Sequence, residues 1–135
     1  MRFFFAIFLA LVPACAATLS VTVANVDKRG GELHVALYDE TSWSNDDAKP
    51  IVDAIVPAIP PQTTVVMTDV APGIYGVKTY QDANKNDRFD EGLFGIPLER
   101  YGFSRDARPR FAEPKFERTK FAIVPGENAI VIHLQ

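Results

Sequence analysis

The residues best suited to chemistry lie in one stretch, between positions 80 and 104. Side chains that carry oxygen recur there at alternate positions, beginning with Asp82 and Asn84. A chain that curls around an ion can direct such oxygens toward one centre, and calcium takes roughly six to eight oxygen ligands. We therefore expect this loop to bind Ca2+. The predicted metal ligands are Asp82, Asn84, Asn86 and Asp90, with Asp87 and Glu99 as possible additions.

The loop departs from an EF-hand at two places. An EF-hand has glycine at position 6 and a bidentate glutamate at position 12, where this chain has Asp87 and Leu93. Asp87 can adopt the required positive φ, but less readily than glycine. The alternative interpretation is an Asn/Asp-rich turn whose side chains satisfy their own backbone. Both interpretations stay open at this level.

Other residues give little support for catalysis. The acidic residues share one loop, whereas hydrolysis by a carboxylate pair needs two acids across a cleft. Ser42 and Ser44 lack the Gly-x-Ser-x-Gly frame of a nucleophile elbow. His34 and His133, with no cysteine beside them, make a weak zinc case. We expect a protein that is not an enzyme; the alternative is a periplasmic hydrolase or other enzyme that uses the acidic loop.

Two features bear on partners. Trp43 is either a platform for a sugar ring or a partly buried anchor. The basic and aromatic residues between positions 99 and 120 either bind an anion or glycan, or pack their loop down with the charges solvated or paired. We expect an unknown protein or glycan partner. The net charge of -3 and pI of about 5.3 exclude the broad basic surface of a nucleic-acid binder.

The N-terminal segment predicts export. Arg2 precedes an apolar run from Phe3 to Val12, and small residues follow up to Ala17. The run is shorter than the ~20 residues of a membrane-spanning helix, so we expect no transmembrane segment in the mature chain. We interpret residues 1–17 as a signal peptide, removed after Ala16 or Ala17, and expect a secreted or periplasmic protein. A lipidated Cys15 is the competing interpretation, although Pro13 is unusual in a lipobox.

The remaining residues, 18–135, predict one all-β domain. Apolar residues alternate with polar ones from Leu19 to Val23 and from Leu33 to Leu37, as in two half-buried strands that we expect to pair as a hairpin. Segment 51–59 contains Pro57 and predicts an irregular or edge segment. Segment 39–50 predicts a loop with one helical turn. Further strands are expected at 62–70, 74–81, 120–124 and 129–134, with long loops after 81 and 104. About seven strands favour a two-sheet sandwich of immunoglobulin-like or transthyretin-like type.

Two motifs carry a family resemblance. The acidic run from Asp82 to Asp87 and the segment from Gly95 to Ser104, which begins Gly-Ile-Pro, resemble the signature of the DUF2141 family. The resemblance implies a small exported bacterial protein with a β-sandwich, and no established activity. The acidic loop is also similar, over a shorter stretch, to transthyretin-like B repeats of surface adhesins. We therefore expect an exported, non-catalytic binding or structural module of the bacterial envelope with a calcium-stabilised loop.

Overall fold

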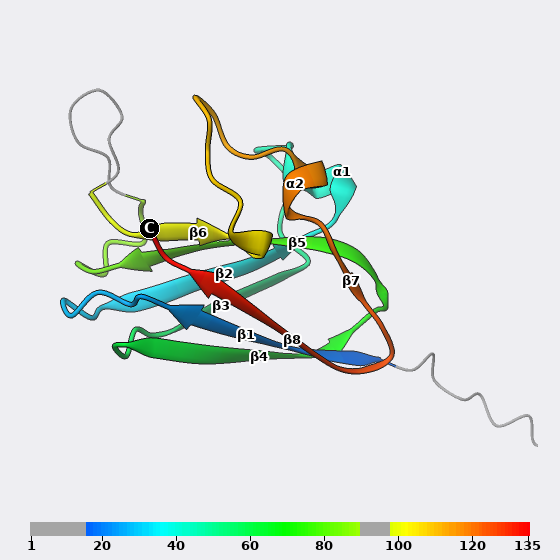
Figure 1. Ribbon diagram of the computed structural model, residues 1–135, viewed down its shortest axis with the longest axis horizontal. Coiled ribbons are helices and arrows are strands. Elements are labelled where there is room, and N and C mark those ends of the chain that lie inside the picture. Colours follow the sequence, from blue (N-terminus) through cyan, green and yellow to red (C-terminus); the bar gives the residue numbers. More distant parts are fainter. Residues whose placement is uncertain (1–15, 90–97) are drawn as a thin grey trace, which may run out of the picture.

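The computed structural model describes residues 16–89 and 98–135 and confirms the all-β sandwich. Two sheets lie face to face, with short helices and a long loop on the outer side of one of them (Figure 1). The elements are β1 (Ala17–Ala24), β2 (Glu32–Tyr38), α1 (Glu40–Trp43), β3 (Val52–Pro57), β4 (Gln62–Val70), β5 (Gly73–Asp82), β6 (Tyr101–Phe103), η2 (Ser104–Asp106), α2 (Phe116–Thr119), β7 (Phe121–Ile123) and β8 (Gly126–His133).

The two sheets differ in size and in pairing. The smaller sheet has the order β4-β1-β8, in which β1 pairs antiparallel with β4 and parallel with β8. The larger sheet has the order β3-β2-β5-β6, all antiparallel, and β7 also pairs with β5. Strand β5 is therefore the centre of the larger sheet, and its C-terminal end leads into the acidic loop.

The core forms because alternate side chains of each strand point to the same face. Leu19 and Val21 of β1 are fully buried, as are Val35, Leu37 and Val77 of the larger sheet. Burying one such aliphatic side chain contributes about 1.5 to 3 kcal/mol. The other face of β2 and β5 is left to polar and aromatic residues, and that face carries the candidate site.

The predicted hairpin between the first two strands is wrong. Strand β1 pairs with β4 and β8, and β2 pairs with β3 and β5, so the two strands belong to opposite sheets. The link between them is fixed to other segments, because the amide of Val26 donates to the carbonyl of Pro61 at 3.0 Å. Crossing between the sheets lets both strands turn their apolar faces toward one shared core.

Other segments follow the expectations closely. Segment 52–57 is the edge strand β3, and α1 is the expected single helical turn, which begins at the N-cap Asp39. The backbone N–H of Ser42 lowers the pKa of the Asp39 carboxyl by donating to it at 2.9 Å. The three-residue strand β6 was not predicted, because three residues are too few to show alternation.

Trp43 is an anchor and not an exposed platform. Its side chain is buried, and its Nε1 donates to the carbonyl of Pro114 at 2.9 Å. Gly76 allows this packing, since a Cβ at that position would lie 2.7 Å from the Trp43 ring. The indole thereby connects the 105–115 loop to β5.

We expect Leu37→Ala to lower the free energy of unfolding by about 2 to 5 kcal/mol, because the fully buried side chain would leave a cavity. Leu98→Ala is the matched control: Leu98 is 59% exposed, so its truncation should change stability by less than about 0.5 kcal/mol. Urea denaturation followed by circular dichroism measures both. Equal losses in the two variants would contradict this assignment of the core.

Candidate metal centre

The outer face of the larger sheet brings two acidic residues directly opposite each other. In the register of β2 and β5, Glu32 is the partner of Asp82 and His34 is the partner of Tyr80. Like charges at opposed positions of an antiparallel pair destabilise the sheet. A positive charge between Glu32 and Asp82 would remove that penalty.

Asp82 organises the loop that follows β5. Its carboxylate is fully buried and accepts the backbone N–H of Asn86 at 3.1 Å and of Asp87 at 2.6 Å. Lys85 and Asp87 both have φ of +57°, a left-handed conformation in which the chain turns back toward Asp82. The turn expected from the Asn/Asp-rich sequence is therefore present, and Asp87 has the positive φ that its position requires.

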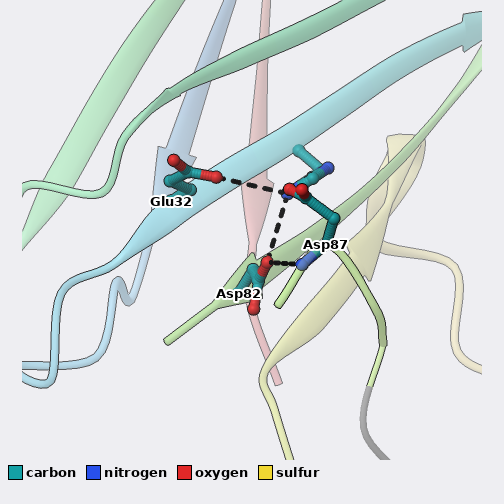
Figure 2. A group of neighbouring side chains, drawn as sticks. Glu32, Asp82 and Asp87 are labelled. Atoms are coloured by element: carbon teal, nitrogen blue, oxygen red, sulfur yellow. Dashed lines mark hydrogen bonds and ion pairs between the residues drawn. The ribbon is translucent and has the colours of Figure 1, made fainter. Parts of the chain in front are cut away.

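This turn completes a cluster around His34. The Nε2 atom of His34 lies 3.5 Å from a carboxylate oxygen of Asp82, 3.7 Å from one of Asp87 and 3.8 Å from one of Glu32. Figure 2 shows the three carboxylates converging from β2, from the end of β5 and from the loop. All four ligand atoms lie within 4.8 Å of one another. The cluster combines a buried acid, Asp82, with an exposed one, Asp87.

The unsatisfied nitrogen is the decisive feature of this geometry. His34 Nε2 is buried and has no hydrogen-bond partner in the part of the chain that the structure describes. Its distances to the carboxylates are at or beyond the limit of a hydrogen bond. They are close to the ~3.4 Å that separates two ligands about 2.1 Å from a tetrahedral ion. Glu32, His34, Asp82 and Asp87 could therefore hold a metal ion.

The predicted ligands do not all lie in the cluster. Asp82 and Asp87 lie in the cluster, whereas Asp90 lies outside the described residues. The Asn84 side chain accepts the N–H of Asn86 at 3.3 Å, and the Asn86 side chain accepts that of Arg88 at 3.0 Å. Both amides thus shape the loop.

Glu99 holds the start of the loop from the other side. It is buried and accepts the backbone N–H of Ala83 at 3.0 Å, beside the cluster but not among its four members. The six-residue ligand set taken as a whole stays a prediction.

Two members of the cluster were not connected with the acidic loop from the sequence: Glu32 was not singled out, and His34 was considered only as a weak zinc ligand. Glu32 and His34 precede the acidic loop by about fifty residues, and only the β2–β5 register brings them to it. A signal was available in the sequence: two residues that can bind metal, spaced by two on the polar face of a predicted strand. That spacing places both side chains on one face.

The family assignment follows from a comparison with known proteins. The sequence profile of "Uncharacterized protein conserved in bacteria (DUF2141)" matches residues 21–131, which include all four residues of the cluster. The chain belongs to the DUF2141 family. No curated protein and no solved structure shows a significant similarity to it. Within the described ranges, no helix of this DUF2141 protein is long and apolar enough to cross a bilayer.

The turn before β2 is hydrogen-bonded to the end of β5, next to the cluster. Gln81 is buried; its Oε1 accepts the N–H of Asp27, and its Nε2 donates to the carbonyls of Asp27 and Gly30. Gly31 has φ of +85°, and a Cβ there would lie 2.2 Å from the carbonyl oxygen of Asp82. The end of β5 and the start of β2 are thereby held at one separation.

Aromatic rings support the cluster on its other side. The His34 ring stacks on Tyr80 at a centroid distance of 4.5 Å, and Phe89 packs edge-on against Tyr80 at 5.6 Å. Phe89 thus anchors the loop to the outer face of the sheet. Burial, and then the carboxylates of Asp82, Glu99 and nearby acids, raises the pKa of Tyr80 to about 12. Several carboxylates therefore lie close to Tyr80 and to the cluster.

We expect Gln81→Leu to destabilise this DUF2141 protein by about 2 to 4 kcal/mol, because three backbone groups would lose their partners inside the fold. Thermal and urea unfolding measure the loss. Gln62→Leu is the matched control, since Gln62 is exposed at the start of β4 and should cost less than about 0.5 kcal/mol. A Gln81 variant as stable as the Gln62 variant would show that the network does not hold the turn.

Proposed function

We propose that this protein is an exported, non-catalytic binding or structural module of the bacterial envelope, whose loop after β5 is clamped by a divalent metal ion. The ligands in this proposal are Glu32, His34, Asp82 and Asp87. One observation carries it: the buried Nε2 of His34 lacks a hydrogen-bond partner among the described residues and faces three carboxylates at 3.5 to 3.8 Å. Such a nitrogen needs a partner, and a bound cation supplies one.

The donor set favours a first-row transition ion such as zinc. A neutral imidazole nitrogen suits zinc and its neighbours, whereas calcium prefers oxygen ligands only. One nitrogen and three carboxylate oxygens make a four-coordinate set, the usual number for a structural zinc site. Calcium, expected from the alternating oxygens after Gln81, is the competing ion, and it would draw on the loop oxygens without needing His34.

Export is supported by the N-terminal sequence. The apolar run before Ala17 is typical of a signal peptide, and the family profile describes a bacterial protein. Ala17 is the first residue of β1 and is fully buried between β4 and β8. Cleavage after Ala16 would leave that strand complete, so we expect the mature protein isolated from the periplasm to begin at Ala17 when its mass is measured.

The alternative function is a periplasmic hydrolase that uses the same acidic site. The observation in its favour is that His34 belongs both to the cluster and to the wall of an open cavity. A hydrolase would need the metal to keep a position open for water. Turnover of chromogenic esters or phosphoesters by the metal-loaded protein, lost in His34→Gln, would favour the enzyme over the clamp.

The metal proposal is tested by thermal unfolding of the exported protein after chelation and after addition of zinc. A zinc concentration about one hundred times Kd should add about 2.7 kcal/mol of stability and raise Tm by several degrees. We expect His34→Gln to abolish this shift. His133→Gln is the matched control, because His133, on β8, contacts Asp106 of η2 and lies outside the cluster.

Three outcomes would contradict the proposal. One is a Tm that no divalent ion changes. A second is a zinc shift that survives in His34→Gln. The third is a shift produced by calcium alone and kept in His34→Gln, which would replace the transition ion with the calcium loop expected from the sequence.

A further inference from the structure

A cavity lies beside the cluster, on the same outer face of the larger sheet. It has a volume of about 770 Å³, opens over β2, β5 and β6, and falls within the size range of small-molecule sites. In the strand register, Ala36 lies between Asp53 of β3 and Lys78 of β5, and Lys78 is the partner of Phe103. The side chain of Ala36 is only a methyl group, so it leaves space for the cavity between these larger neighbours.

Aromatic rings form the walls. Tyr80, Phe89, Tyr101 and Phe103 follow one another at centroid distances of 5.6, 5.8 and 6.0 Å, each pair edge to face. This interlocked packing fixes the rings before any ligand arrives, and all four line the cavity. The walls therefore offer preorganised aromatic surface, which reduces the ordering cost of binding.

The rim carries an unusual residue. Phe111 lines the cavity, its side chain is fully exposed, and its backbone has φ of +67°. A left-handed conformation is unfavourable for a bulky residue, and an exposed phenyl ring gains nothing from burial. Residues with strained backbones of this kind cluster at ligand sites.

Among the described residues that line the cavity, the carboxylates of Asp53 and Glu113 outnumber the one ammonium group, that of Lys78. Asp53 is exposed and forms no ion pair within residues 16–89 and 98–135, while Glu113 is paired with Lys78 at 2.8 Å. Burial raises the pKa of Tyr38, and the carboxylates of Asp53 and Glu113 raise it further, as expected in a negative field. An anionic ligand is thus disfavoured.

Two rings on the same face of the sheet, Tyr38 and Trp43, already accept a cation. The Lys78 ammonium group lies 4.6 Å from the ring centroid of Tyr38 and 4.5 Å from that of Trp43, with Glu113 beside it. These distances are those of cation–π contacts. Lys78 is neutralised by Glu113, so its charge does not repel a second cation at the remaining rings.

We infer that the cavity binds a small organic cation, an alkylated ammonium group held against Tyr101 and Phe103 with Asp53 as its counter-charge. Cation–π recognition needs aromatic faces and is strengthened by a nearby carboxylate. A neutral sugar would use the rings but not the charge. This inference rests on the proposed role as a binding module, for which it names the class of ligand. It does not require a metal ion in the cluster.

The test is calorimetric titration of the exported protein with choline and with 3,3-dimethylbutan-1-ol, which has the same shape but no charge. We expect choline to bind at least about tenfold more tightly than the alcohol. Asp53→Asn should weaken choline binding several-fold, and Tyr101→Leu should weaken it by about tenfold. The matched control is Asp46→Asn, which removes an exposed carboxylate outside the cavity lining and should leave binding unchanged.

Three results would overturn the inference: no binding of choline up to millimolar concentration, equal binding of choline and its neutral isostere, or a choline affinity that Asp53→Asn leaves unchanged. A glycan that binds while choline does not would assign the cavity to sugars. Glu32→Gln separates this inference from the metal clamp, because Glu32 belongs to the cluster but does not line the cavity. That variant should lose the zinc shift and keep choline binding.

Discussion

The carboxylate of Asp82 is the constraint on which the outer face of this protein depends. It is a charged group withdrawn from water at the end of β5, and such a group requires partners on every side. Two backbone N–H groups of its own loop supply part of this requirement, and Gly31 passes close to its carbonyl oxygen. His34 and Glu32 approach from β2 because the strand register places them there. The buried carboxylate thus fixes a turn through both of its oxygens, and its Oδ2 also lies 3.5 Å from His34 Nε2.

The turn and the cation site are compatible. A carboxylate offers about four lone pairs, so two N–H donors leave capacity for a metal ion. The hydrogen bonds of Asn86 and Asp87 to Asp82 also hold the loop in the conformation that brings the Asp87 carboxylate to His34. A self-satisfied turn therefore does not exclude a cation site, because the same turn brings together carboxylates that could hold an ion.

In the larger sheet, alternate side chains face either the core or the outer surface. Leu33, Val35 and Leu37 face the core, while Glu32, His34 and Tyr38 face outward from the same strand. The core can hold the fold without restricting the outer residues. This freedom lets one face carry acids, an imidazole and interlocked aromatic rings, and it places the metal cluster and the aromatic cavity side by side with His34 shared between them.

The sequence by itself determined the local features: the strands with period-two apolar patterns, the sandwich class, the single helical turn within 39–50 and the Asn/Asp-rich turn that begins at Asp82. These depend on neighbours within a few residues, which alternation and turn chemistry reveal. Only the tertiary structure decided that β1 and β2 lie in opposite sheets and that Glu32 and His34 join the acidic loop. Pairing between strands far apart in sequence follows from how all the apolar faces are buried together, and no single segment encodes it.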